Sequence, residues 1–160
     1  MYIITKPNID DVDEIMSLID SRIKWMDKVH IEQWNKTHYF ERYPKEYFIN
    51  NIEYFYIAKK ENKIVGFLAA YTQDERWPNQ RNGYYIHHLT IDLNEKGLGI
   101  IMLKYMEEEA KINNKEVIRL DSAVGNKKLE KYYTDLGYKE VGTCIDGLYK
   151  GILREKEIVL

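Results

Sequence analysis

Two glycines in the second half of the chain could form an anion-binding turn. Gly97 and Gly99 lie in the segment 94–100, between a strand-like run at 84–91 and a helix-like run that begins near Leu98. The first N–H groups of a helix have no partner inside it, and they carry the positive end of the helix dipole. Glycines there let the backbone approach a phosphate without side-chain obstruction. The same pattern also fits an ordinary structural turn.

Histidines could supply acid–base chemistry. His87 and His88 are adjacent on a strand-like run, so by alternation they face opposite sides of a sheet. Histidine is the natural base near neutral pH, although either residue can also be a packing or surface residue. His30 and His38 complete the set, and none of the four has ligand spacing with acidic or cysteine partners, so we predict no metal site. Cys144 is interpreted as a small buried hydrophobe rather than a nucleophile.

The bulk composition excludes several classes of partner. A net charge of −2 over 160 residues gives no global electrostatic case for nucleic acid or an anionic membrane. A single cysteine rules out an internal disulfide framework and fits a reducing compartment. No apolar run approaches the ~20 residues of a membrane helix, and no N-terminal segment has the pattern of a signal peptide. We therefore expect a soluble, cytoplasmic protein.

The pattern of apolar residues predicts the elements that position these groups. Asn8 can cap a first helix with apolar positions from Val12 to Met26, and a second helix within 39–51 is interrupted near Pro44. A polar link at 60–63 joins two strands into a hairpin. The expected strands are 2–5, 54–59, 64–71, 84–91, 117–120, 138–144 and 151–158, and the later helices are 98–113 and 126–136, the last ended by Gly137.

These elements follow the order β-α-α-β-β-β-α-β-α-β-β. The natural assembly is a mixed α/β (α+β) sheet, antiparallel in its first half and with a β-α-β crossover in its second. With no linker, repeat or low-complexity segment, residues 1–160 are predicted to form a single domain.

The order of elements and two motifs resemble the GNAT superfamily of N-acetyltransferases. The family's turn reads Q/R-x-x-G-x-G/A, and residues 94–99 follow it from Asn94 onward. A later block typically reads N-x-x-A-x-x-x-Y-x-x-x-G-F/Y, and Asn126, Leu129, Tyr133, Gly137 and Tyr138 occupy those positions. Residues 119–133 are also similar to an uncharacterised bacterial subgroup. The resemblance covers nearly the whole chain and implies a largely antiparallel seven-stranded sheet flanked by about four helices.

The resemblance implies acetyl-CoA as co-substrate. The pyrophosphate would bind the backbone amides of the glycine turn, with Lys96 adding a positive charge. The pantetheine arm would pair with the strand that ends at Ile91, and a backbone N–H there could polarise the thioester carbonyl. Asn126 would contact the pantetheine or begin the helix beside it. The implied cofactor-binding residues are Leu89, Thr90, Ile91, Glu95, Lys96, Gly97, Leu98, Gly99, Ile100, Asn126 and Tyr133.

The turn departs from the family pattern at two positions. Asn94 replaces the usual Gln or Arg, and Glu95 places a negative side chain where a positive or small residue is usual. We expect the Glu95 side chain to point into solvent while its amide still binds, which would weaken CoA binding without abolishing it. These departures favour the alternative of a catalytically silent CoA- or ligand-binding module, whereas Tyr133 and Asn126 oppose it.

The implied reaction is direct attack of a primary amine of a small molecule or peptide on the acetyl thioester. Tyr133 matches the family's acid position and would protonate the leaving thiolate. It could also simply pack on the sheet, and its neighbour Tyr132 is the more natural packing residue. The base is Asp121, where several members keep an acidic residue, or His87. Asp121 could instead form a salt bridge with Arg119 or a lysine.

Aromatic and acidic residues could line the acceptor site. In this family that site involves the connection of the first two helices, the middle strands and the last hairpin. Trp34, Tyr85 and Tyr149 are the principal candidates, and aromatic walls with carboxylates suit an amine cation. Gln33, Trp25 and His30 are further candidates, although the tryptophans could only join the helices to the sheet. The resemblance makes a homodimer plausible.

Overall fold

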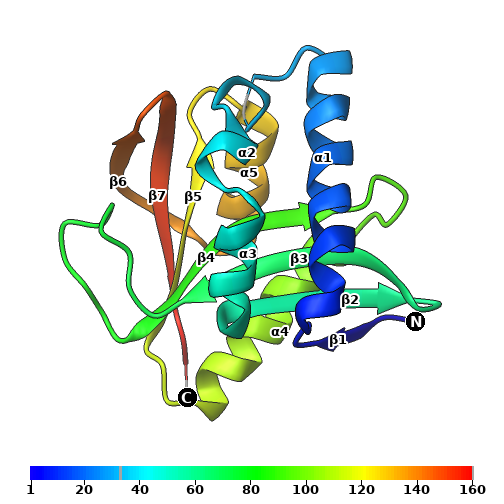
Figure 1. The fold of residues 1–160 in the computed structure, drawn as a ribbon. Coiled ribbons are helices and arrows are strands. Elements are labelled where there is room, and N and C mark those ends of the chain that lie inside the picture. The colour runs from blue at the N-terminus through cyan, green and yellow to red at the C-terminus, as the bar shows by residue number, and fades with distance from the viewer. Residues whose placement is uncertain (33, 160) are drawn as a thin grey trace. The chain divides into compact units, whose positions relative to one another are not determined.

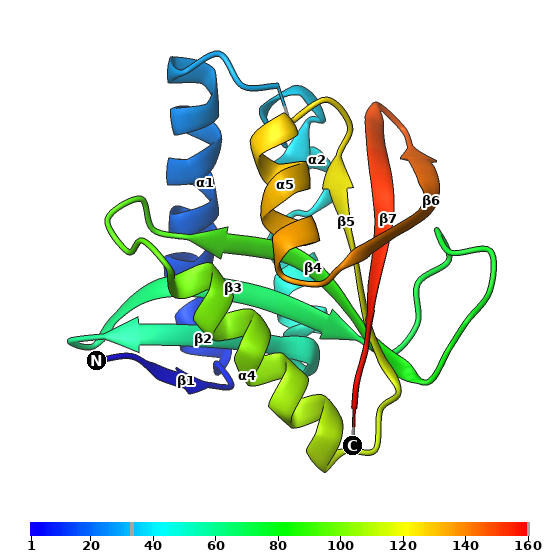
Figure 2. The same cartoon turned by 180° about the vertical axis from the view of Figure 1, so that it is seen from behind.

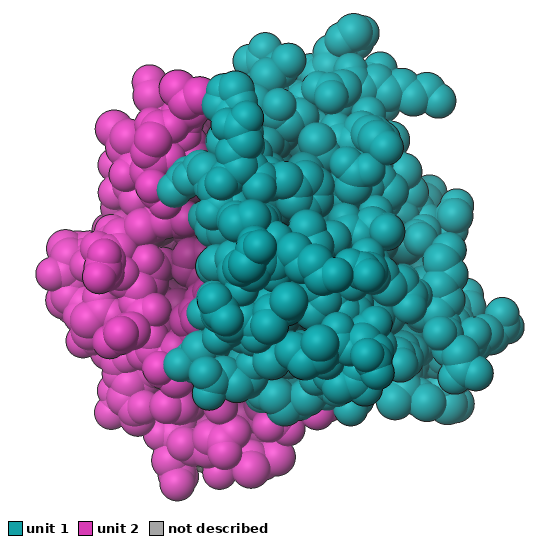
Figure 3. Space-filling model, viewed as in Figure 1, with its two compact units in different colours: residues 1–69, 88–102 teal, residues 70–87, 103–160 magenta. Residues whose placement is uncertain are grey.

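The computed structural model describes residues 1–32 and 34–159 of the 160-residue sequence. The chain divides into two compact units, coloured separately in Figure 3. Unit 1 comprises residues 1–69 and 88–102, and unit 2 comprises residues 70–87 and 103–160. Three elements pass from one unit into the other, namely β3 (Lys63–Tyr71), β4 (Gly83–Ile91) and α4 (Leu98–Ile112).

The expected mixed sheet is confirmed, with seven strands in the order β1-β2-β3-β4-β5-β7-β6. Strands β4 and β5 are parallel, and the pairs β1–β2, β2–β3, β5–β7 and β6–β7 are antiparallel. The remaining elements are β1 (Ile3–Thr5), α1 (Val12–Lys28), α2 (Tyr39–Arg42), α3 (Lys45–Asn50), β2 (Phe55–Lys60), β5 (Val117–Ala123), α5 (Lys127–Asp135), β6 (Lys139–Asp146) and β7 (Tyr149–Glu157). Short 3-10 turns occupy Ile9–Asp11, Trp34–Lys36 and Ile52–Tyr54.

In unit 1, helices α1 and α3 lie on one face of β2 and β3 (Figure 1). Asn8 caps the 3-10 turn Ile9–Asp11 that leads into α1 rather than α1 itself, since its side chain accepts from the Asp10 N–H and the Asp11 carboxylate accepts from the Asn8 N–H. The predicted helix in 39–51 is divided at Pro44, which has no N–H to continue α2 and begins α3 instead. The core contains Ile15, Ile19, Phe48, Phe55 and Phe67, all with no exposed surface.

In unit 2, α5 packs against β5 and β6 (Figure 2). Asn126 caps α5 by accepting the Leu129 N–H at 3.1 Å, and Gly137 ends it with φ +92°. Strand β5 is longer than predicted, because residues 121–123 continue to pair with β7. Asp121 is therefore inside a strand, opposite Leu153, rather than in the connection that follows it.

None of the helices in the described part of the chain combines the length and the apolar character needed to cross a bilayer.

Candidate active site

The glycine turn in unit 1 presents free backbone donors. Gly97 has φ +86°, and a Cβ placed on it would meet no atom within 4 Å, so glycine is required there by backbone conformation and not by space. The Glu95 N–H is already used, since it donates to the Asp92 carbonyl at 3.0 Å, and the Leu98 N–H lies 3.3 Å from the Glu95 carbonyl. The N–H groups of Lys96, Gly97, Gly99 and Ile100 have no acceptor within the described part of unit 1. These four amides form the part of the predicted cradle that can still bind an anion.

The Glu95 side chain does not point into solvent, contrary to our expectation. Its carboxylate accepts from the Tyr2 hydroxyl at 2.7 Å and from Lys60 Nζ at 3.0 Å. The hydrogen bonds from Tyr2 and Lys60 lower the pKa of Glu95 below its ordinary value. The negative charge is thus compensated by Lys60 on β2, and the Tyr2 hydroxyl adds a hydrogen bond. The repulsion of a phosphate that this residue would otherwise cause is correspondingly reduced.

The strand next to the turn carries the residues assigned to the pantetheine arm. Leu89 and Ile91 are half-buried, and Thr90 is buried with its hydroxyl donating to the His88 carbonyl at 2.7 Å. His88 itself has φ +59°, which interrupts regular strand geometry and its simple alternation. The His88 ring is buried in unit 1, where its two nitrogens contact the hydroxyls of Tyr39 and Tyr47. His88 is therefore the packing member of the histidine pair.

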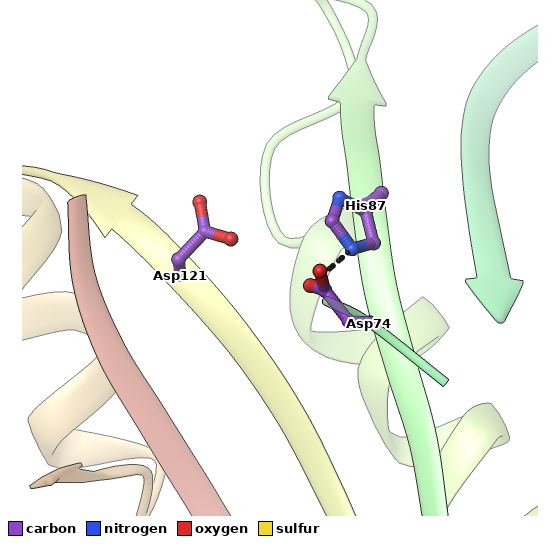
Figure 4. A group of neighbouring side chains, drawn as sticks. All are labelled: Asp74, His87 and Asp121. Atoms are coloured by element: carbon purple, nitrogen blue, oxygen red, sulfur yellow. Dashed lines mark hydrogen bonds and ion pairs between the residues drawn. The ribbon is translucent and has the colours of Figure 1, made fainter. Parts of the chain in front are cut away.

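His87 belongs to a cluster of titratable side chains in unit 2 (Figure 4). Its Nε2 lies 2.8 Å from Oδ2 of Asp74, a residue of the loop between β3 and β4. The Tyr71 ring contacts the imidazole edge-on, with 5.4 Å between ring centroids. Asp121, on β5, completes the group, since one ligand-type atom from each of the three residues lies within 4.8 Å of the others. The structure thus brings together two of the predicted catalytic residues, His87 and Asp121.

Asp121 is held by partners that the sequence did not predict. Arg76 Nη1 lies 3.1 Å from Oδ2, and the Tyr149 hydroxyl donates to Oδ1 at 2.6 Å. The alternative of a salt bridge at Asp121 is confirmed, but the partner is Arg76 and not Arg119 or a lysine, since Arg119 pairs with Glu155. With a donor on each oxygen, Asp121 is less suited than His87 to take a proton from an amine.

The geometry of this cluster raises the question of a metal ion. Two carboxylates and an imidazole are a common ligand set, but Asp74 and His87 are hydrogen-bonded to each other, and Asp121 is held by Tyr149 and Arg76. The guanidinium of Arg76 also lies against Asp121, where a cation would approach, and it contacts Asp146 at 3.1 Å through Nη2. Like-charge repulsion disfavours a divalent ion beside it. We therefore interpret the cluster as an acid–base group.

Tyr133 lies on α5 and is 7 % exposed, whereas Tyr132 is only half-buried. The expectation that Tyr132 is the packing residue of the pair is therefore not supported. Burial, followed by the charges of Tyr132 and Asp121, raises the pKa of Tyr133 far above its ordinary value, so the phenol stays protonated. The Tyr133 hydroxyl makes no hydrogen bond to a described residue. Because every fully buried side-chain oxygen in the described chain has a partner, this hydroxyl reaches the surface.

The three candidates for the acceptor wall differ in accessibility. Trp34 is half-buried in unit 1 and packs on Tyr39 with 5.3 Å between ring centroids. Tyr149 is half-buried, and its hydroxyl is used by Asp121. Tyr85 has no exposed surface, and its hydroxyl contacts the Arg81 N–H and Arg119. The assignment of Tyr85 to the acceptor wall is therefore not supported, and Gln33 lies outside the described residues.

Sequence reasoning missed Asp74 and Arg76, the two loop residues that contact His87 and Asp121. No local periodicity marks them, because their partners are 13 and 45 residues away along the chain. The one sequence feature that could have indicated a role for them is that an acidic and a basic residue lie in a loop leading into the strand that contains His87.

Cys144 is expected to resist alkylation in the native protein. It is buried on β6 beside Trp77, Tyr85 and Leu153, and burial raises the pKa of its thiol from 9.0 to about 11. At pH 8 this lowers the thiolate fraction roughly 100-fold, and access is restricted as well. Iodoacetamide labelling followed by mass spectrometry should be at least that much slower in the native than in the denatured protein. Equal labelling rates would show that the thiol is exposed and reactive.

The seven-stranded mixed sheet and the glycine turn at the start of α4 are features of the acetyltransferase class of α/β proteins. The model of the acetyltransferase (GNAT) family matches residues 19–138, and the chain belongs to this family. That family uses acetyl-CoA. Among curated proteins, no sequence matches the chain significantly.

Solved structures agree on the fold. A GNAT-family acetyltransferase from Listeria monocytogenes has a TM-score of 0.79 at 18% identity, covering 98% of this chain and 94% of that chain. The PaiA N-acetyltransferase from Thermoplasma acidophilum, in complex with coenzyme A, has a TM-score of 0.78 at 20% identity, covering 98% and 99%. A GNAT-family acetyltransferase from Streptococcus agalactiae has a TM-score of 0.79 at 17% identity, covering 99% and 96%. At these identities the likeness concerns the fold alone.

Proposed function

We propose that this protein transfers an acetyl group from acetyl-CoA to a primary amine of a small molecule or peptide, by direct attack in a ternary complex. The observation that carries the proposal is the set of free amides at Lys96, Gly97, Gly99 and Ile100, at the N-terminus of α4. Such a set fits a pyrophosphate, because each N–H can donate to an oxygen and the helix dipole favours negative charge. Family membership supports acetyl-CoA as the donor.

The remaining cofactor contacts are proposed from the family motifs. The Lys96 side chain, which is exposed, would add a positive charge beside the pyrophosphate. The backbone of Leu89, Thr90 and Ile91 would pair with the pantetheine arm, and Asn126 and Tyr133 would contact it from the start and the middle of α5. Because the family model spans 19–138, across both units, we also propose that residues 1–160 act as a single acetyltransferase domain.

The chemistry requires two proton transfers. His87 removes a proton from the substrate ammonium, and the free amine then attacks the thioester carbonyl carbon. A C–N bond forms, the C–S bond breaks, and the CoA thiolate leaves. Tyr133 donates its proton to that sulfur and regains one from solvent. We prefer His87 to Asp121 as the base because imidazole titrates near neutral pH and both Asp121 oxygens already accept hydrogen bonds.

Calorimetric titration with acetyl-CoA and with CoA tests the donor. We expect micromolar affinity for both ligands, followed by turnover when amines are screened with a thiol-detecting reagent. Binding without turnover of any amine would favour the alternative of a silent CoA-binding module. Absence of binding at millimolar cofactor would overturn the proposed function.

Replacing Tyr133 by Phe is expected to lower turnover on the order of 10²-fold while leaving acetyl-CoA affinity nearly unchanged, because only the proton donor is lost. Tyr132→Phe is the matched control, since it removes the neighbouring hydroxyl from the same helix turn. Steady-state rates and calorimetry separate the two effects. Full activity in the Tyr133→Phe variant would remove the proposed acid.

A further inference from the structure

The loop that carries Asp74 is held firmly within unit 2. The Asp74 N–H and carbonyl bond to the side chain of Gln80 at 2.9 and 2.7 Å. Buried Arg119 donates to the Asn79 carbonyl at 2.8 Å and stacks on Trp77 in the same loop, 4.1 Å from its ring centroid. Arg76 ties the loop to Asp121 on β5 and to Asp146 on β6. The position of the Asp74 carboxylate is therefore set by the fold.

The Asp74 carboxylate is ionised in this setting. Burial alone would raise its pKa, but the hydrogen bond and charge of His87, the Arg76 N–H at 3.0 Å and the Arg76 charge together lower it below the ordinary value of 3.8. An ionised carboxylate can only accept hydrogen bonds. The short contact between Asp74 Oδ2 and His87 Nε2 therefore requires a proton on Nε2.

This requirement selects one form of the neutral imidazole. With the proton on Nε2, the lone pair that can accept a proton is on Nδ1, the ring nitrogen directed away from Asp74 in Figure 4. Asp74 also stabilises the imidazolium that forms when His87 takes up a proton, because the carboxylate charge lies 2.8 Å away. Within unit 2, Asp121 and Arg76 are charged groups that face this cluster, the Tyr149 hydroxyl donates to Asp121, and the Tyr71 ring packs on His87.

We propose that Asp74 is a positioning residue that fixes the orientation and the Nε2–H tautomer of His87, so that Nδ1 is the nitrogen that accepts the proton of the acceptor amine. The part that concerns the amine rests on the proposed function, whereas the tautomer is a property of the protein alone. This arrangement explains why an anchored loop places a largely buried carboxylate beside the histidine.

The tautomer is measured directly by NMR. Long-range ¹H–¹⁵N correlation on histidine-labelled protein separates Nε2–H from Nδ1–H imidazoles, and His87 is assigned among the four histidines by its absence in His87→Gln. We expect Nε2–H in the wild type. In Asp74→Asn the amide can donate to Nε2, so the tautomer should change to Nδ1–H or become mixed. A wild-type spectrum with Nδ1–H at His87 would overturn the proposal, whatever the enzyme does.

Kinetics test the functional part. Asp74→Asn should lower kcat on the order of 10²-fold with unchanged acetyl-CoA affinity. Glu75→Gln is the matched control, because it removes a carboxylate charge from the next position of the same loop, where the side chain is exposed. An equal loss in both variants would reduce Asp74 to a structural role and overturn the positioning assignment. If the wild type acetylates no amine, the proposed function fails while the tautomer measurement still decides the role of Asp74.

The free energy of unfolding of the wild type and of Asp74→Asn, measured against pH, tests whether Asp74 is ionised in the native state. Because folding lowers the pKa of Asp74, its ionisation stabilises the protein at pH values above 3.8, and this contribution is lost as the pH falls through the lower folded value. Wild type and Asp74→Asn should therefore differ in free energy of unfolding at neutral pH and converge in acid. A stability difference that is independent of pH would contradict an ionised Asp74 in the native state.

Discussion

The His87→Gln variant is expected to lose turnover on the order of 10²- to 10⁴-fold, the range of a general base. Glutamine can place an amide N–H near the position of Nε2, so the hydrogen bond to Asp74 can persist and the loop need not move. What is lost is a group that can accept a proton near neutral pH. The acidic limb of the pH–rate profile reports deprotonation of the base. We expect this limb to be absent from the residual activity of the variant.

The Asp121→Asn variant shows whether this loss is specific to His87. The asparagine side chain would keep an acceptor for the Tyr149 hydroxyl but lose the charge that pairs with Arg76. If His87 is the base, Asp121→Asn should retain the pH limb even where its rate is reduced. The opposite result, a lost limb in Asp121→Asn and a retained one in His87→Gln, would transfer the role of base to Asp121. His30→Asn, at an exposed turn of unit 1, controls for loss of a histidine as such.

The elements of the fold were predictable because their causes are local. A cap at Asn8, a proline at 44, and a glycine with positive φ at 137 each act within a few residues, and each began or ended an element. The end of β5 was not predictable in this way. Residues 121–123 carry polar and small side chains, and they remain a strand only because β7, much later in the chain, pairs with them.

The candidate site was predictable only in part, for the same reason. The glycine turn is read from neighbouring residues, whereas the cluster around His87 needs a loop, a parallel strand and the final hairpin to converge. Glu95 illustrates the limit. Its side chain departs from the family pattern in sequence, yet Lys60 compensates its charge and Tyr2 hydrogen-bonds to it, both from distant parts of the chain. Tyr85 is the opposite case. Its aromatic side chain suits the wall of the acceptor site in sequence, but in the structure it is buried in the core.

Gly97→Val is expected to weaken acetyl-CoA binding by about 10- to 100-fold, the equivalent of losing one charge-assisted hydrogen bond at roughly 1.5–3 kcal/mol. A β-branched residue at φ +86° is strongly disfavoured, so the turn must change conformation and redirect its amides. Crowding within the protein does not explain the loss, because no described protein atom lies within 4 Å of the position of the added Cβ. Calorimetry with acetyl-CoA and with CoA measures the change, and both ligands should be affected alike because they share the pyrophosphate.

Gly137→Val separates this effect from general strain. Gly137 has φ +92° at the end of α5, so valine there should cost comparable stability, but it lies outside the cradle. We expect both variants to have a lower Tm and only Gly97→Val to lose affinity. Gly97→Asn should retain more affinity than Gly97→Val, because asparagine tolerates the left-handed region. Unchanged affinity in Gly97→Val would mean that the pyrophosphate does not bind these amides, and a loss as large in Gly137→Val would mean that the assay reports stability rather than the cradle.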